Sequence, residues 1–260
     1  MKEFLNVFKI NQNISKRVAS ELVLIQVIFF FLFWYVTPTG IIPKPHEIFS
    51  AFGDLWNEGI AVDLKTSFVL NVQALLITSV LSMFLSYLTT IPFFRPIVAV
   101  LTKLRFLSLV GLTVVFTLLS TGSHSLKLLL LVFGMSVFFL TSMGEVSAAT
   151  KEELDYARTL RMGELHVVWE VVILGKMDKA IEVMRDNAAM GWMMLTMVEG
   201  LARSEGGIGV LLLNQNKHFH LDAVFAIQFS VIFLGLGQDY AIGWIKDLLC
   251  PYAKLEMERR

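Results

Sequence analysis

The chain has 260 residues, of which 55% are hydrophobic and 17% are charged. Soluble domains contain roughly 45–50% apolar and about 25% charged residues, so the composition excludes an ordinary soluble domain and predicts a membrane-embedded protein. The formal charge is zero, so the total charge indicates no nucleic acid or other strongly charged partner. Cys250 is the only cysteine, which excludes an intrachain disulfide and a cysteine-cluster metal site, and we expect no metal.

Apolar segments recur along the chain, which predicts an all-α membrane protein of about six transmembrane helices. Residues 1–17 alternate apolar and basic side chains, as a cytoplasmic amphipathic segment does, although a solvated tail fits equally well. Residues 18–260 form the predicted transmembrane domain. Its spans are expected at about 18–37, 66–94, 97–120, 125–143, 187–203 and 223–245, each able to reach the roughly 20 residues that cross a bilayer core.

Basic residues indicate the orientation of these helices. With the amino terminus inside, inner segments hold all of the 22 Lys and Arg residues except Lys44, Lys65, Lys127, Arg203 and Lys217. Under the positive-inside rule, this bias places both termini and the loop 144–186 in the cytoplasm.

A surface helix is expected between the first two spans. Ile48, Phe52 and Leu55 recur at helical spacing after Pro43 and Pro45. This pattern predicts an amphipathic helix over 46–58 at the outer surface.

The second span carries a ridge of small side chains at four-residue intervals, formed by Ala74, Thr78, Ser82 and Ser86. Small residues let helix backbones approach closely in a membrane. The ridge fits internal packing best, with a dimer seam or a translocation path as alternatives.

The loop 144–186 contains a short, charged helix between membrane-grade segments. Thr150 followed three residues later by Glu153 is a capping-box signature, so the helix should begin near Lys151. One side of it is formed by Leu154, Ala157, Leu160 and Arg161. This side predicts docking to a cytoplasmic partner, although it could also pack on the membrane ends of neighbouring spans.

The residues after this cap form a motif. Asp155, Tyr156 and Ala157 are followed by Arg158, Thr159 and Leu160. The run resembles the EAA loop of bacterial ABC-importer permeases, in which an acidic and two small residues precede Arg-Thr-Leu-Gly. The family's glycine falls on Arg161, with Gly163 two residues on, and its later proline falls on Leu174.

Two further stretches extend the likeness to roughly residues 40–250. Arg185, Trp192 and Glu199 have the spacing of an Arg, a Trp and a Glu of the nitrate, sulfonate and taurine class of these permeases. Gly207-Ile208-Gly209 resembles the Gly-Leu-Gly that follows, and 43–59 resembles the outer-face helix that precedes the permease core.

The resemblance implies a type I ABC-importer permease in the cell inner membrane, with both termini cytoplasmic. It implies a homodimer, a cytoplasmic ATPase subunit that binds ATP and Mg, and a periplasmic or lipid-anchored substrate-binding protein; this chain would bind no cofactor. Membrane lipids are the remaining partner. The solute would be small, in the class of nitrate, sulfonates or taurine. ATPase coupling would fall to Glu153, Asp155, Tyr156, Ala157, Arg158, Thr159, Leu160, Arg161 and Gly163. Translocation or gating would fall to Arg185, Trp192 and Glu199.

Burying the ionisable side chain of Glu199 at membrane depth costs free energy, so we expect it to have either an interaction partner or a functional role. A contact with Arg203, one turn later, and a role in gating are both open. Gly206 to Gly209 lack the Lys-Ser/Thr of a phosphate-binding loop and are expected to form a flexible turn.

Two other function classes remain as alternatives. A membrane-embedded enzyme would need convergent ionisable groups at membrane depth, and Glu199 is the one clear candidate. An ATP-independent secondary carrier would show an inverted repeat and broken helices, and neither is visible. No nucleotide-binding or hydrolase motif occurs, so we expect a transport subunit with ATP hydrolysis on a separate chain.

Overall fold

The computed structural model describes residues 15–36, 42–148, 150–203 and 206–251, and every regular element among them is a helix. The elements are α2 Lys16–Val36, α3 Pro45–Asn57, α4 Ile60–Leu88, η1 Pro92–Phe94, α5 Arg95–Lys103, η2 Leu104–Phe106, α6 Leu109–Leu119, α7 Ser123–Ser147, α8 Lys151–Thr159, α9 Glu164–Val167, η3 Val168–Leu174, α10 Met177–Leu201, α11 Ile208–Lys217 and α12 Leu221–Leu249. The all-α class is confirmed. The expected amphipathic segment 1–17 lies almost entirely outside the described residues.

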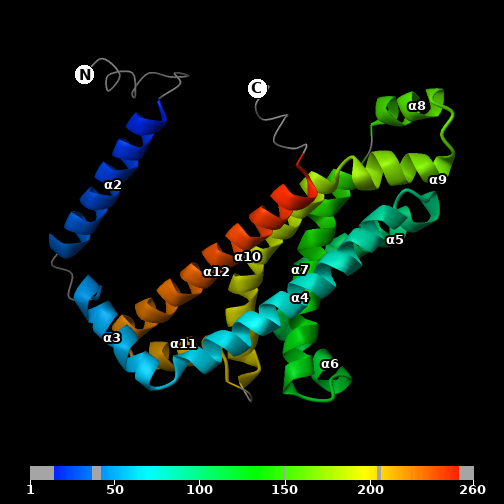
Figure 1. Cartoon of the computed structure of the whole chain (residues 1–260). Coiled ribbons are helices and arrows are strands. Elements are labelled where there is room, and N and C mark those ends of the chain that lie inside the picture. Colours follow the sequence, from blue (N-terminus) through cyan, green and yellow to red (C-terminus); the bar gives the residue numbers. More distant parts are fainter. Residues whose placement is uncertain (1–14, 37–41, 149, 204–205, 252–260) are drawn as a thin grey trace.

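Four long helices, α4, α7, α10 and α12, form the body of the molecule (Figure 1). The beginning of α2, the end of α12 and the helix α8 lie at one end of this body. The helices α3, α6 and α11 lie at the other end (Figure 1). The two ends of the described chain therefore share a side with the charged loop.

Four of the described helices are long and apolar enough to cross a membrane: α2, α4, α7 and α12. A fifth span arises if α5 and α6 together count as one. α10 has a comparable length, but charged residues occupy its first half. The prediction of a membrane protein is thus supported in its general form, while the count of six spans remains a prediction.

The expected span 97–120 is not one straight helix. The segment bends by 113° between Phe106, where η2 ends, and Leu109, where α6 begins. Lys103 and Arg105 fall in the middle of this segment, where a continuous span would bury both charges in lipid. The expected span 66–94 is also displaced, because α4 begins at Ile60 and ends at Leu88, shortly before Pro92.

The core lies where α4, α7 and α10 meet, and it contains Leu70, Leu131, Met135, Leu195 and Trp192. The ridge of small residues on α4 is completely buried there. Ser86 shares a hydrogen bond of 2.7 Å with the Ser147 hydroxyl of α7, and Ser82 donates to the Ser136 carbonyl. The ridge therefore serves internal packing.

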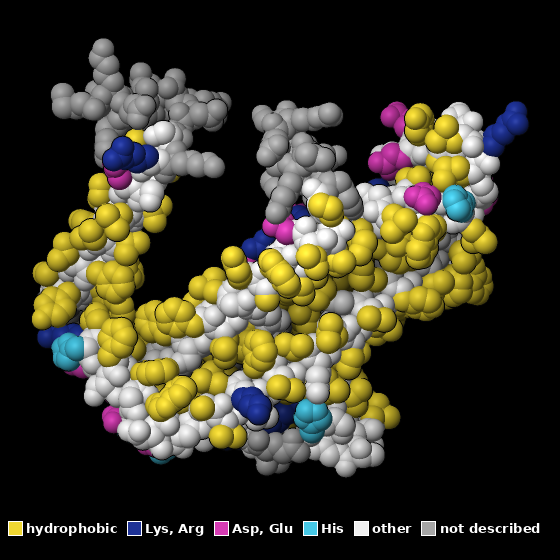
Figure 2. Space-filling model, viewed as in Figure 1, with side chains coloured by type: hydrophobic (Ala, Val, Ile, Leu, Met, Phe, Trp, Pro, Cys, Tyr) yellow, Lys and Arg dark blue, Asp and Glu magenta, His cyan; other side chains and the backbone are white. Residues whose placement is uncertain are grey.

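α2 and α3 stand at the edge of this body. α2 diverges from α12 toward the end that carries α8, and hydrophobic side chains cover it (Figures 1 and 2). The expected helix over 46–58 is confirmed as α3, which buries Ile48, Ala51 and Leu55. Phe49 and Trp56 remain exposed on its other side, as in a helix that lies in a membrane interface.

Candidate functional site

The charged loop begins with the predicted capping box. The Thr150 backbone N–H donates to Glu153 Oε2 over 2.9 Å, and the Glu153 backbone N–H donates to Thr150 Oγ1 over 3.3 Å. The first of these bonds lowers the pKa of the Glu153 carboxyl below its ordinary value, and Lys176 contributes to the same shift. Lys176 Nζ also donates to the Ala148 carbonyl, so the loop is tied to the end of α7.

Arg158 joins α8 to α9. Its Nε and Nη2 donate to the two carboxylate oxygens of Glu164 over 3.1 and 3.2 Å, and Nη1 donates to Asp155 over 3.2 Å. This bidentate geometry fixes direction as well as distance. Its hydrogen bonds lower the pKa of the Glu164 carboxyl, so the pair stays ionised at neutral pH.

Arg161 adopts a left-handed backbone conformation, with φ of 57°. α8 ends at Thr159, and Arg161 follows at the position where a chain commonly leaves a helix with positive φ. This is the place where the EAA motif has a glycine. The backbone at this position therefore has the geometry that glycine adopts without strain, although the side chain differs.

A π-helix anchors the second half of the loop. The Gly175 N–H donates to the Glu170 carbonyl, and i→i+5 bonding brings residues five apart toward one side. Val167 and Val172 are accordingly both buried. Trp169 remains exposed on another side. The contacts of η3 are mainly with α8 and α9, so the buried valines pack within the loop itself.

Four apolar side chains of the loop are exposed, and the sequence analysis did not identify them as a group. Tyr156, Leu160, Leu165 and Trp169 are 69%, 60%, 88% and 53% exposed. Ala157 behaves differently from the expectation, because it is 3% exposed and packs inside the loop. Ala157 is small because its own chain covers it, so the docking side would be formed by its exposed neighbours.

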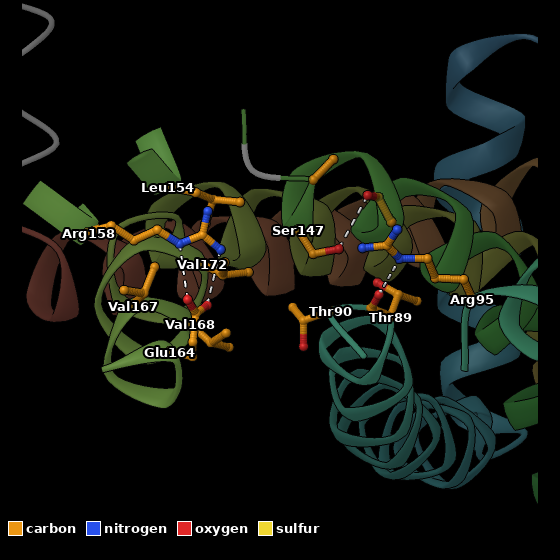
Figure 3. A pocket seen from close by; sticks show the side chains of 12 residues that line it. Thr89, Thr90, Arg95, Ser147, Leu154, Arg158, Glu164, Val167, Val168 and Val172 are labelled. Carbon is orange, nitrogen blue, oxygen red and sulfur yellow. Dashed lines mark hydrogen bonds and ion pairs between the residues drawn. The ribbon is translucent and has the colours of Figure 1, made fainter. Parts of the chain in front are cut away.

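A cavity of about 430 Å³ separates this loop from the bundle (Figure 3). Leu154 and Arg158 close it on the loop side, and Thr89 and Arg95 close it beside the end of α4. Arg95 Nε donates to the Thr89 carbonyl over 3.0 Å, which caps that helix end. The loop is held at its two ends and does not rest on a fully packed surface between them.

The three candidate gating residues share one face of α10, since each lies seven residues from the next. Arg185 forms a bidentate ion pair with Asp239 of α12. Trp192 Nε1 donates to Gln238 Oε1 over 2.9 Å, and Asn71 of α4 donates to the same oxygen over 3.1 Å. Arg185 and Trp192 therefore do not meet in one site. Each of them bonds α10 to α12 at a different position along the helix.

Glu199 is fully buried and does not contact Arg203, so that expected pair is wrong. Arg203 is exposed and donates to the Gly200 carbonyl in its own chain segment. Glu199 Oε1 accepts from the Ser67 hydroxyl over 2.6 Å, and Oε2 accepts from the Gly209 N–H over 2.8 Å. The carboxylate therefore sits at the amino-terminal end of α11, where the helix dipole favours negative charge.

The glycine-rich turn is held rather than flexible, contrary to expectation. The N–H groups of Gly207 and Ile208 donate to Asp63 and to the Ser67 hydroxyl, both over 2.9 Å. Lys127 Nζ donates to the Gly206 carbonyl over 2.8 Å. We call Asp63, Ser67, Lys127 and Glu199, with the turn 206–209, the glycine-turn latch. It joins α4, α7, α10 and α11.

Sequence reasoning missed several of these groups. Gln238 and Asp239 are the adjacent polar pair in an otherwise apolar stretch of α12, which is the signal that could have found them. Lys127 was counted only among the basic residues on the outer side, and Asp63 was not singled out. Among the described residues, no three His, Cys, Asp or Glu side chains gather as metal ligands do. No protein-family model matches the chain, and no curated protein matches it.

Proposed function

We propose that the chain is the transmembrane subunit of an ATP-driven importer of the ABC type, for a small solute in the class of nitrate, sulfonates or taurine. The observation that carries the proposal is the loop α8–η3. It has a capped helix, a left-handed residue at the motif's glycine position and four exposed apolar side chains. A solvated loop gains nothing from four exposed apolar side chains, whereas a docking surface does.

Transmission of motion is the task we assign to the loop. A cytoplasmic ATPase subunit would bind Tyr156 and Leu160, and closure of the ATPase pair would displace the loop. The ties of Lys176 to α7 and the continuation of η3 into α10 give that displacement a path to the bundle. The face of α10 that carries Arg185 and Trp192 would pass it to α12. Such a rigid-body mechanism couples nucleotide and solute to one two-state equilibrium.

The experiment removes the exposed apolar side without touching the buried part of the loop. The double variant Tyr156→Ser/Leu160→Ser should lose co-purifying ATPase activity from native membranes by at least about tenfold, because two interface anchors are removed. Leu118→Ser, which replaces an even more exposed leucine on α6 at the other end of the molecule, is the control. ATP hydrolysis by the purified chain alone, or an unchanged double variant, would contradict the proposal.

A further inference from the structure

A pocket of about 450 Å³ lies where α2 and α12 meet above α3. Its walls are almost entirely apolar, with Phe31 and Trp34 from α2, Ile48 and Phe52 from α3, and Phe229 and Phe233 from α12. Trp34 stacks on Phe229 with ring centroids 6.3 Å apart, and this contact closes the vertex between the two helices. Both helices are long and apolar enough to cross a membrane, so the pocket opens toward lipid.

One polar group in this pocket has no hydrogen-bond partner among the described residues. Trp34 Nε1 is buried and donates to none of them. Ser230, the lining residue with a hydroxyl, already donates to the Ala226 carbonyl over 2.8 Å. A buried indole N–H normally finds an acceptor. The site therefore calls for a ligand that is apolar over most of its length and carries an acceptor oxygen at one point.

A positive charge lies next to the same pocket. Lys44 directly precedes Pro45, which lines the pocket, and its side chain is exposed. Trp34 lies in the last turn of α2, and α3 presents Phe49 and Trp56 as an interfacial helix does. A phospholipid combines an acyl chain, an ester carbonyl and a phosphate, which match in kind the apolar wall, the Trp34 N–H and the Lys44 ammonium.

We propose that this pocket is a phospholipid site, with an acyl chain between α2 and α12, an ester oxygen accepting from Trp34 Nε1, and the phosphate beside Lys44. The site holds α2 against the bundle at a vertex where protein contacts are few. The proposal requires that the chain lies in a membrane, but it does not depend on the transported solute or on an ATPase.

Retention of lipid by the purified chain tests the site. Phosphatidylglycerol is added to delipidated protein in detergent, and native mass spectrometry counts the lipids that remain on each chain. The wild type should retain one. Trp34→Phe, which keeps the ring and removes the N–H, should weaken retention about two- to tenfold, as the loss of one hydrogen bond does. Lys44→Gln should weaken it and abolish its dependence on salt.

Two further variants test whether a loss of retained lipid comes from the pocket itself. Ser230→Leu fills the pocket from a helical position and should expel the lipid, while Trp56→Phe changes an exposed indole of α3 outside the pocket and should leave retention unchanged. Lipid retention that ignores both Trp34→Phe and Ser230→Leu overturns the proposal. It is also overturned if these two variants alter the fraction of dimer instead of the lipid count, because a second copy of the chain then fills the pocket.

Discussion

At the scale of single residues, local rules explain most of the charged loop. Thr150 and Glu153 satisfy each other's backbone N–H groups because both lie within one turn, and Arg161 ends the helix in a conformation that most side chains avoid. The backbone at Arg161 therefore has the left-handed conformation that suits the glycine of the motif, although the side chain here is arginine.

Arg161→Gly should stabilise the loop. A non-glycine residue in the left-handed region costs roughly 1–2 kcal/mol, and glycine removes most of this cost. Hydrogen exchange of the amides in 150–162 should slow in the variant. Gly163→Ala is a useful comparison, because its backbone is not left-handed and nothing lies within 4 Å of an added Cβ. Faster exchange in Arg161→Gly would show that the arginine side chain stabilises the turn.

Acidification should release the cap of α8. The folded pKa of the Glu153 carboxyl lies below its unfolded value, so the cap stabilises the folded loop above about pH 4.3 and this stabilisation is lost as pH falls through the folded pKa. Protection factors in α8 should therefore fall between about pH 5 and 3 in the wild type and in Glu152→Ala. In Glu153→Ala they should already be low at pH 7, because alanine has no acceptor for the Thr150 N–H. A flat profile in the wild type would contradict this role.

The sequence predicted these residues well because their partners are near in the chain. The cap spans three residues, so its chemistry is legible without a structure. Glu199 shows the opposite case, since the partner at Ser67 is 132 residues away and Arg203 was simply the nearest opposite charge. A spacing rule cannot choose between a neighbour on the same helix and a hydroxyl on another one.

At the scale of elements, glycines determine how closely helices approach one another. Gly191 lies against Asn71 and Met135, and Gly209 lies against the Thr196 carbonyl. The bent pair α5–α6 was missed because hydropathy averaged over a window does not register the break between Phe106 and Leu109. The length of each apolar segment was enough to predict that a helix forms there. The direction of the helix and the position of any break depended on where charged residues fall inside the segment.

Gly207→Ala should break the glycine-turn latch. Gly207 has φ of 108°, and an added Cβ would lie 2.4 Å from Glu199 Oε1, so both strain and overlap oppose alanine. We expect a loss of about 1–3 kcal/mol, seen as a lower unfolding temperature in detergent. Gly53→Ala in α3 is the matched control, since nothing lies within 4 Å and helix propensity favours alanine by up to about 1 kcal/mol. Equal unfolding temperatures for the two variants would refute the latch.

At the scale of the whole molecule, the ends of the described chain and the charged loop lie on one side. The glycine-turn latch, α3 and α11 lie on the opposite side, and Lys127 is bound there to the Gly206 carbonyl. This separation agrees with the orientation that the Lys and Arg bias predicts. The phospholipid pocket and the latch lie at the end opposite the charged loop. With the loop in the cytoplasm, both would therefore face the outer leaflet.

Labelling of single cysteines tests this orientation in a Cys250→Ser background. Thr121→Cys and Asn216→Cys, both exposed at the end away from the loop, should react with an impermeant thiol reagent in intact cells. His166→Cys, exposed on α9, should react only after the membrane is opened. Ser147 is a poor reporter for the inner side, because it is buried and shares a hydrogen bond with Ser86. Labelling of His166→Cys from outside would show that the orientation in the membrane is the reverse of the predicted one. The loop could then not meet a cytoplasmic ATPase, and Lys44 would instead face the phosphates of the inner leaflet.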